Sequence, residues 1–378
     1  MRKKLLFVVN DLDFFISHRL AVAREAVAQG YIVSVISAPA SLSSVKQLKN
    51  CGMDFYSIRI TRSGKNPFVE LFSLFSLIWM FWKMRPDIVH LVTIKPVLYG
   101  GIASIFSPVK SVVAAVSGLG FVFMNGGSRE SALRHLVEVL YRFALGKKRL
   151  KVIFQNPDDR DLLVNIKAIT LDQVEMIRGS GVDLSLFDAK SEPQGLPVVC
   201  FAARLLRDKG IYEFINAARI LRNKGVLARF VVAGDIDPGN PTSVSAGDLE
   251  RWRDEGAVEV LGYQRDIAAL FSSVNLVVLP SYREGLPKVL IEAAAAGRAV
   301  VTTDVPGCRD AIEPDVTGLL VPAKNAELLA EAIEKLVVDD LLRKAMGAAG
   351  RDLAEREFGI EKVIERHLDI YAKVVNAA

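Results

Sequence analysis

Short apolar runs alternate with helical patterns along most of the chain. The first six runs are Lys4–Val9, Ile32–Ser37, Phe55–Ile60, Ile88–Thr93, Ser111–Val116 and Val152–Gln155. The alternation restarts with Val198–Ala203, Phe230–Ala233, Val258–Leu261, Leu276–Leu279, Ala299–Thr303 and Gly318–Val321. Because strands that alternate with helices form parallel sheets wound by those helices, the pattern predicts an α/β protein.

A glycine-rich segment and a linker separate the two series of strands. Gly179-Ser180-Gly181-Val182-Asp183 is followed by a Pro/Gly-containing stretch at 191–197. At 378 residues the chain is long for one core and comfortable for two. We expect a first domain at residues 1–180, a second at 181–360, and a C-terminal helix at 361–378 that can pack back on the first domain.

The helical pattern at 67–85 is unusually rich in Phe, Leu and Trp. Its uncharged core, Leu71 to Trp82, is only 12 residues, which is too short to cross a bilayer. Two interpretations remain: a buried helix, or a helix packed on the domain with its aromatic side in a membrane interface. Lys83, Arg85 and the basic run at 147–151 favour the second, since each basic residue near anionic lipid contributes about 1 kcal/mol. A basic run is also common in a solvated loop.

The charge is distributed unevenly along the chain. Residues 1–178 carry 24 Lys+Arg against 13 Asp+Glu, whereas the remainder carries 24 against 30. The basic first half points to an anionic surface as a partner. The three cysteines lack metal-site spacing and fit a reducing compartment, and the first apolar segment reaches Asn10-Asp11 too early for a signal-peptide core.

The stretch from Leu279 to Gly297 predicts a strand, a loop and a helix in succession. Pro287 suits the first helical position, because its missing N–H is not needed there. The preceding loop carries Glu284, Gly285 and Leu286, so free backbone N–H groups at the helix start can bind phosphate. Glu292 lies about 7.5 Å further along the axis. Two carboxylates on either side of an anion site suit a sugar nucleotide, although an ordinary βα unit can contain the same residues.

A second anion signal follows the strand at Val198–Ala203. Arg204 and Lys209 lie in a basic loop before a helix. Cations at the carboxyl end of a strand in an open α/β sheet lie where such folds bind ligands. Arg204 can contact two phosphate oxygens at once, and Lys209 can add a point charge. We therefore expect this loop to act together with the Glu284–Glu292 unit.

These residues resemble the retaining glycosyltransferases of family 4, which have the GT-B fold of two Rossmann-like domains with parallel sheets facing across a cleft. The resemblance implies that Arg204 and Lys209 bind the donor diphosphate and that Glu284 contacts the transferred sugar. It also implies that N–H groups of Gly285, Leu286 and Lys288, next to Pro287, approach the diphosphate, and that Glu292 holds the ribose. Gly234-Asp235 resembles the Gly-Asp-Gly turn of the family, with Ile236 in place of the second glycine, and Leu261-Gly262-Tyr263 resembles its base-contacting segment.

The first half resembles the branch that builds bacterial surface polysaccharides and glycans on undecaprenyl diphosphate. The segments that carry this resemblance run from Asn10 to Arg19, from Thr93 to Pro96 and from Ser117 to Gly120. They suggest acceptor-binding residues, namely Ser17, His18, Lys95, Gly118 and Gly120. His18 can orient an acceptor hydroxyl or be structural, Lys95 can meet acceptor phosphate or the donor side, and His90 is expected to be a core residue.

The resemblance implies a hexosyltransferase that moves a sugar, an N-acetylhexosamine, from a UDP-sugar to a polyprenyl-diphosphate-linked saccharide during O-antigen or related glycan synthesis. The UDP-sugar is a substrate rather than a cofactor. Neither a metal ion nor nucleic acid is expected, although Asp11-Leu-Asp13 and Asp235-Ile-Asp237 invite a metal interpretation. The expected location is the cytoplasm, at the inner face of an anionic membrane.

Two other functions remain open from the sequence. A UDP-N-acetylhexosamine 2-epimerase on the same fold would bind the same donor without an acceptor. A non-catalytic protein that binds sugar nucleotides or membrane glycans would also retain the donor site.

Overall fold

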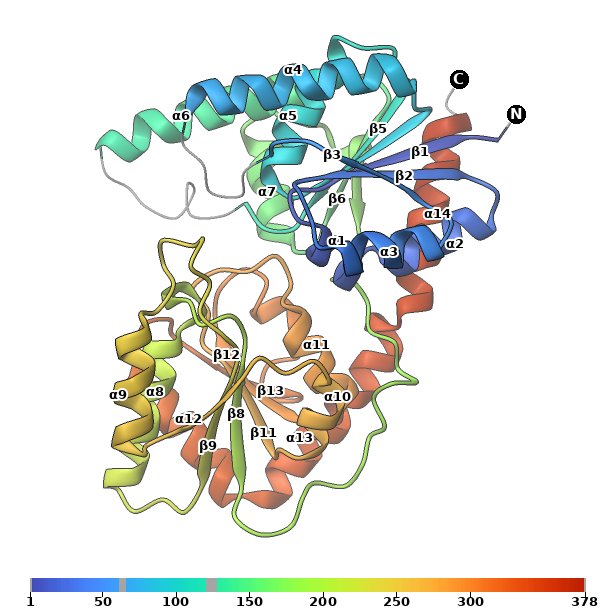
Figure 1. The fold of residues 1–378 in the computed structure, drawn as a ribbon. Coiled ribbons are helices and arrows are strands. Elements are labelled where there is room, and N and C mark those ends of the chain that lie inside the picture. The colour runs from blue at the N-terminus through green and yellow to red at the C-terminus, as the bar shows by residue number, and fades with distance from the viewer. Residues whose placement is uncertain (1, 61–65, 120–127, 377–378) are drawn as a thin grey trace. The chain divides into compact units, whose positions relative to one another are not determined.

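The chain folds into two compact units. The computed structural model describes residues 2–60, 66–119 and 128–376 (Figure 1). The first unit comprises Met1–Ser180 and Glu361–Ala378, and the second comprises Gly181–Ile360. Each unit has its own parallel sheet and its own core.

In the described part of the first unit, seven parallel strands lie in the order β3-β2-β1-β4-β5-β6-β7. The strands are β1 (Lys4–Val8), β2 (Ile32–Ser37), β3 (Asp54–Ser57), β4 (Ile88–Val92), β5 (Ser111–Val116), β6 (Leu150–Phe154) and β7 (Val174–Met176). The helices are α1 (Leu12–His18), α2 (Leu20–Ala28), α3 (Leu42–Asn50), α4 (Pro67–Met84), α5 (Ile94–Ile105), α6 (Ser128–Ala144), α7 (Pro157–Asn165), η2 (Leu171–Gln173) and α14 (Ile360–Asn376).

In the described part of the second unit, six parallel strands lie in the order β10-β9-β8-β11-β12-β13. The strands are β8 (Val198–Ala202), β9 (Arg229–Ala233), β10 (Glu259–Gly262), β11 (Leu276–Leu279), β12 (Ala299–Thr303) and β13 (Gly318–Val321). The helices are η3 (Arg207–Lys209), α8 (Ile211–Asn223), α9 (Ala246–Glu255), α10 (Ile267–Ser272), α11 (Lys288–Ala295), η4 (Arg309–Ala311), α12 (Ala326–Val338), α13 (Asp340–Leu353) and η5 (Ala354–Phe358).

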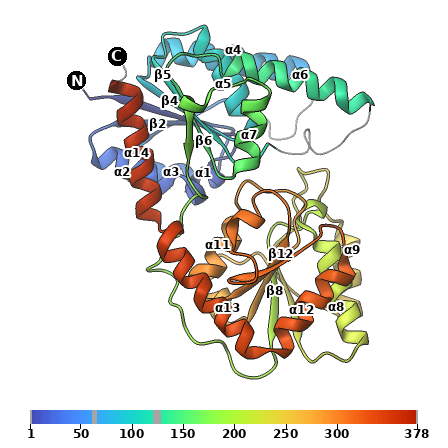
Figure 2. The ribbon, with the colours of Figure 1, turned by 180° about the vertical axis from the view of Figure 1, so that it is seen from behind.

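The two sheets confirm the α/β prediction. Every residue of the central strands β4, β5, β8, β11 and β12 is buried, because helices cover both faces of each sheet (Figures 1 and 2). Strands buried on both faces appear in a sequence as continuous apolar runs, the signal on which the prediction depended. Strand β3 ends earlier than the expected run, and the three-residue β7 was not anticipated.

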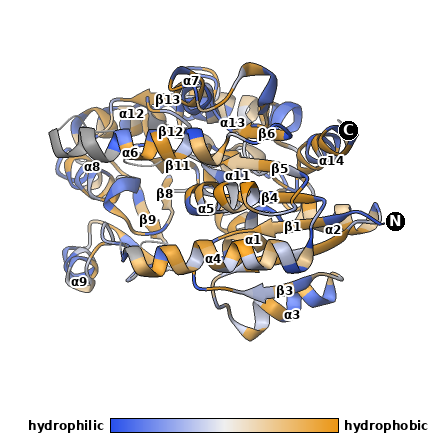
Figure 3. Ribbon diagram, turned by 90° about the horizontal axis from the view of Figure 1, so that it is seen from above, coloured by the Kyte–Doolittle hydropathy of each residue, from blue (hydrophilic) through white to orange (hydrophobic). Residues whose placement is uncertain are grey.

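Helix α4 is not a buried helix, which excludes one of the two interpretations of its sequence. Leu77 and Phe81 point into the core of the first unit and are completely buried. Phe72, Phe75 and Trp79 are instead 59–60% exposed. The helix therefore packs on the unit by one apolar side and presents a second apolar side to the surface, and Figure 3 shows its largely hydrophobic length.

The C-terminal helix α14 packs on the first sheet through a buried polar cluster. Tyr371 and His367 of α14 and His90 of β4 are completely buried. The Nδ1 atom of His90 lies 2.6 Å from the hydroxyl oxygen of Tyr371, and the two histidine rings stack with centroids 5.6 Å apart. Arg19, also buried, interacts with Tyr371. His90 is thus a core residue, as expected.

Burial keeps the two histidines of this cluster neutral. It lowers the pKa of His90 well below its usual range, and His367 and Arg19 lower it further. Burial also lowers the pKa of His367 to about 3, with Arg19 acting in the same direction. Unfolded histidine takes up a proton near pH 6.5. Unfolding in acid is therefore coupled to proton uptake at both positions, which favours the unfolded state as the pH falls.

We predict that the free energy of unfolding decreases as the pH drops below about 6.5, by about 1.4 kcal/mol per pH unit for each buried histidine until its folded-state pKa is reached. Chemical denaturation at pH 7.5, 6.0 and 5.0 measures this dependence. His367→Leu should reduce the slope, whereas substitution of the exposed His135 by Leu should not. Equal slopes for wild type and His367→Leu would contradict the explanation.

Candidate functional site

The residues predicted to bind a donor follow four neighbouring strands of the second sheet. Tyr263 follows β10, Gly234-Asp235 follows β9, and Arg204 and Lys209 follow β8. The Glu284 loop follows β11, next to β8. The strand order reverses between β8 and β11, and open α/β sheets bind ligands at the carboxyl edge beside this switch point. The sheet therefore brings these residues to the edge where a ligand is expected.

A cation and a carboxylate meet at the switch point. The ammonium group of Lys209, in η3, forms an ion pair with the carboxylate of Glu284. Ser281 donates a hydrogen bond of 2.6 Å to the same Oε1 atom of Glu284. The Lys209 and Glu284 side chains are only 22% and 12% exposed. Lys209, predicted to bind the diphosphate, and Glu284, predicted to contact the transferred sugar, are thus in contact in a partly desolvated position.

The backbone joins the loops that carry this pair. The N–H of Tyr282 donates to the carbonyl of Asp208 at 2.9 Å. Gly210, with φ of +75°, lies so near Pro280 that a Cβ atom would be 2.1 Å from the Pro280 carbonyl oxygen. Glycine is required at this approach both for its backbone conformation and for lack of space. The two loops therefore form one unit rather than two independent surface segments.

The loop after β12 supports Glu284 from the other side. Glu284 donates its N–H to the carbonyl of Pro306 at 3.0 Å, and Thr303 donates to the carbonyl of Ser281. Gly307 has φ of +83°, and a Cβ there would lie 2.5 Å from the Glu284 carbonyl oxygen. The sequence analysis did not identify this support, although Pro306-Gly307 shortly after β12 is a recognisable turn signal.

Arg204 pairs with a different carboxylate from the one that pairs with Lys209. Its Nη1 atom donates to the carboxylate of Asp237 at 2.6 Å, and 43% of its side chain is exposed. Gly234 lies against β8, where a Cβ would be 1.9 Å from the Ala203 carbonyl oxygen, and its N–H donates to the carbonyl of Gly262. Tyr263, the next residue, is 68% exposed. A ligand at this edge has to compete with Asp237 for the guanidinium.

Helix α11 begins one residue later than expected. Pro287 is its N-cap, with φ of −70° and ψ of 123°, and Lys288 is the first helical residue. Gly285 and Leu286 are buried in front of it. The Glu292 side chain is 12% exposed and lies 3.2 Å from the Lys288 ammonium group. Burial raises the pKa of Glu292, while Lys288 acts in the opposite direction.

The residues predicted to bind an acceptor follow β1, β4 and β5, which are adjacent in the first sheet. His18 is the last residue of helix α1, and its ring stacks on Phe14 with centroids 4.1 Å apart. Ser17 Oγ lies 2.7 Å from His18 Nδ1 and donates to backbone carbonyls of α1. These contacts within the helix satisfy both side chains locally.

Lys95 lies at the start of α5 and contacts α4. Its ammonium group is 2.5 Å from Glu70. Thr93, directly after β4, has φ of +76°, a conformation that costs energy for a residue other than glycine. Its Oγ1 atom is buried and has no hydrogen-bond partner among the residues that the structure describes. Such strain at a strand end is typical of functional positions, and the sequence alone did not identify it.

Gly118, at the end of β5, has φ of +103°, which glycine adopts without penalty. Gly120, the last of the predicted acceptor residues, lies outside the described residues.

Carboxylates of the two acidic triplets bind groups of the protein itself. Asp11 caps α1 by accepting from the N–H groups of Asp13 and Phe14, and Asp13 accepts from Ser44 at 2.5 Å. Asp237 pairs with Arg204. Within residues 2–60, 66–119 and 128–376, no three His, Cys, Asp or Glu side chains are grouped to hold a metal ion.

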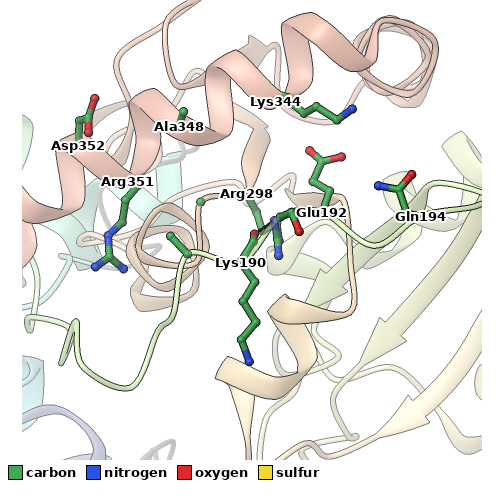
Figure 4. A pocket seen from close by; sticks show the side chains of 11 residues that line it. Lys190, Glu192, Gln194, Arg298, Lys344, Ala348, Arg351 and Asp352 are labelled. Atoms are coloured by element: carbon green, nitrogen blue, oxygen red, sulfur yellow. Dashed lines mark hydrogen bonds between the residues drawn. The ribbon is translucent and has the colours of Figure 1, made fainter.

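Figure 4 shows a pocket of about 450 Å³ in the second unit that contains none of the predicted site residues. Arg298 within it is buried and donates to the carbonyls of Phe271 and Lys190. Glu192 accepts from Arg343 at 2.8 and 2.9 Å. These bonds attach the linker before β8 to the amino-terminal edge of the sheet and to α13, which indicates a structural role.

Two family models match the chain in its two halves. The model described as glycosyl transferases group 1 matches residues 185–353, and the model described as glycosyl transferase 4-like matches residues 4–156. The first covers Arg204, Lys209, Glu284 and Glu292. The second covers the strand ends that carry His18 and Lys95.

Relatives and solved structures agree with these matches. The N,N'-diacetylbacillosaminyl-diphospho-undecaprenol alpha-1,3-N-acetylgalactosaminyltransferase of Campylobacter jejuni is 30% identical over 87% of this chain and 88% of the relative. The UDP-Gal:alpha-D-GlcNAc-diphosphoundecaprenol alpha-1,3-galactosyltransferase of Escherichia coli is 25% identical over 81% and 80%. Sucrose-phosphate synthase from Thermosynechococcus elongatus matches with a TM-score of 0.82 and 19% identity over 100% of both chains, which confirms the GT-B fold. The chain belongs to the group 1 glycosyltransferases of family 4 and is a glycosyltransferase.

Proposed function

We propose that this enzyme transfers an N-acetylhexosamine from a UDP-sugar to a hydroxyl of a polyprenyl-diphosphate-linked saccharide. The observation that carries the donor assignment is the Lys209–Glu284 pair at the switch point of the second sheet. The acceptor assignment is supported by the two relatives, whose names specify undecaprenol-diphosphate saccharides and either N-acetylgalactosamine or galactose as the transferred sugar.

The donor would bind along the carboxyl edge of the second sheet. Glu284 contacts the transferred sugar, and Lys209 lies beside it to meet the diphosphate. N–H groups of Gly285, Leu286 and Lys288 approach the same diphosphate at the start of α11, where the helix dipole favours an anion. Glu292, next to Lys288, holds the ribose hydroxyls.

Arg204 would exchange partners when the donor binds. In this structure it pairs with Asp237, which follows Asp235 in the turn after β9. The guanidinium is exposed enough to turn, and a diphosphate offers it a charged acceptor with the same planar geometry. Asp237 would thus hold Arg204 near the edge until the diphosphate replaces it.

The reaction breaks the bond between C1 of the sugar and the diphosphate oxygen and joins C1 to the acceptor oxygen. The departing diphosphate takes the acceptor proton on the same face, so configuration at C1 is retained. Arg204, Lys209 and the N–H groups before α11 stabilise the charge that develops on the leaving group. Fixed positive groups perform this work without reorganisation during the reaction.

The acceptor would meet the first unit at the strand ends that carry His18, Lys95 and Gly118. Because its lipid is embedded in a bilayer, the enzyme would work at the inner face of the cytoplasmic membrane, in assembly of O-antigen or a related surface glycan. The basic first half of the chain suits an anionic leaflet.

A panel of radiolabelled UDP-sugars, each incubated with and without lipid extract, tests this proposal. A UDP-N-acetylhexosamine should label the lipid fraction, and release of UDP should depend on the extract. Isomerisation of the donor without extract would instead indicate an epimerase. Binding of the donor with neither product would indicate a non-catalytic protein.

We predict that Glu284→Ala and Lys209→Ala each lower the rate of transfer at least about 100-fold, as loss of one preorganised charged group does in other enzymes. The matched control is the Lys224–Glu334 ion pair on the surface of the same unit. Lys224→Ala and Glu334→Ala should transfer at the wild-type rate. Near-normal rates for both site variants would overturn the site assignment.

We further predict that Gly307→Ala lowers transfer at least about 10-fold while the protein stays folded, because the new Cβ has to displace the Glu284 carbonyl. Gly225→Ala is the control, since Gly225 has a similar φ of +78° but nothing within 4 Å of an added Cβ. Both variants place alanine at a similar positive φ. If they lose activity equally, displacement of Glu284 is not the cause.

A further inference from the structure

Helix α4 presents a continuous row of apolar side chains to the surface. From Phe68 to Trp82, every exposed side chain is Phe, Leu or Trp, at 51–81% exposure. These residues are Phe68, Leu71, Phe72, Phe75, Trp79 and Trp82. Their spacing places them on one side of the helix. A helix on the surface of a water-soluble protein normally places polar residues on that side.

The orientation of this helix is fixed by its other side. Leu77 and Phe81 are buried in the core. Ser73 donates to the carbonyls of Arg59 and Val69, and Glu70, the one acidic residue of α4, pairs with Lys95. The helix cannot rotate to bury its aromatic residues without exposing this set. Its apolar outer side is therefore a permanent surface.

Helices α5 and α6 extend the apolar surface. Helix α5 packs on both α4 and α6, and the indole N–H of Trp82 donates to the carbonyl of Phe106 at 2.9 Å. Phe106 and Phe143, both about half exposed, lie with ring centroids 6.2 Å apart. We call this surface the aromatic patch; it comprises the six α4 residues together with Ile105, Phe106, Leu136, Val139 and Phe143.

Basic groups border the aromatic patch. Lys83 lies 4.9 Å above the ring of Trp79. The exposed Lys148 follows Lys147, a few residues after Phe143 of the patch. A pocket of about 400 Å³ beside Phe143 is lined by Ile105, Phe143, Gly146, Arg142 and Lys147. Its lining contains two cations and no carboxylate. Lys147 also donates to the carbonyls of Ser104 and Val109, and Arg142 donates to the carbonyl of Ile166 and lies 3.8 Å from Glu138, so a phosphate would share them with these groups. A cationic hollow next to an aromatic surface suits a phosphate headgroup beside acyl chains.

We propose that the aromatic patch docks on an anionic phospholipid leaflet, with the α4 aromatic residues in the interfacial region and Arg142 and Lys147 at a headgroup phosphate. This inference rests on the proposed function, since it identifies the surface by which the enzyme reaches a lipid-linked acceptor. None of the helices in the described ranges could span the bilayer, so contact occurs at the interface. A second copy of the chain is a poorer occupant, because it would bring two basic borders together.

The tryptophans provide a direct measurement. Two of the three, Trp79 and Trp82, lie in the aromatic patch, whereas Trp252 is buried in the second unit. With phosphatidylglycerol–phosphatidylethanolamine vesicles, the emission of Trp252→Phe protein should shift to the blue and be quenched by brominated acyl chains. If Trp252→Phe protein does not fold, the same emission and quenching can be measured on wild-type protein. Absence of quenching at low salt would overturn the proposal.

Variants of the patch test its location. Phe75→Asp and Trp79→Asp should each lower vesicle affinity at least about 10-fold in co-sedimentation. Leu341→Asp, at a leucine that is 77% exposed on α13, is the matched control and should bind like wild type. Lys148→Glu should weaken binding about fivefold or more at low salt and less at high salt. Equal binding by patch and control variants would place the membrane contact elsewhere.

Two further measurements separate this inference from its alternatives. Phe75→Asp should retain transfer to a water-soluble, short-chain diphosphate acceptor and lose transfer to a long-chain acceptor in vesicles. If the proposed glycosyl transfer is wrong, wild type will use neither acceptor. The vesicle-binding measurements would still show whether the aromatic patch contacts the membrane. A different result would show that the patch joins two copies of the chain. In that case wild type would sediment as a dimer and would not bind vesicles, and the Phe75→Asp variant would be a monomer.

Discussion

The donor edge depends on the contact between the loop after β8 and the loop after β11. A backbone hydrogen bond, a glycine at close approach and the Lys209–Glu284 ion pair all connect the same two loops. Because β8 and β11 are hydrogen-bonded neighbours, the sheet rather than a flexible side chain sets the distance between cation and carboxylate. Charge stabilisation is effective only when the groups are held before the reaction begins. The contact therefore connects the folding of the second unit to the chemistry proposed for it.

Local signals in the sequence were sufficient for the sheets and for the residue types at the strand ends. Continuous apolar runs identified the central strands because both their faces are buried. The short β7 has no such run. The partner of Arg204 and the support from Gly307 could not be predicted, since each involves a contact between distant segments. The outer side of α4 was ambiguous for another reason: both sides of the helix are apolar, so periodicity does not show which one is buried.

Helix α4 also relates the two proposals for the first unit. Glu70 holds Lys95 at the strand end assigned to the acceptor, and the next residue, Leu71, belongs to the aromatic patch. The surface proposed to meet the lipid, on α4, is thus joined by an ion pair to Lys95 of α5, the residue proposed to meet the lipid-linked substrate. A displacement of α4 at the membrane would shift Glu70, the partner of Lys95, which gives the acceptor site a mechanical connection to the bilayer.

The place of α14 in the chain has a consequence for biosynthesis. Helix α14 is made after the whole second unit, yet its Tyr371 and His367 complete a core whose other side, with Phe7 and His90, belongs to β1 and β4. The first unit therefore remains incomplete on the ribosome while the whole second unit, a continuous segment, emerges and folds. Until α14 leaves the ribosome, the β4 face around His90 lacks its cover. The first unit is thus begun before the second unit and completed after it, and loss of α14 would damage the first unit although the whole second unit lies between them in the chain.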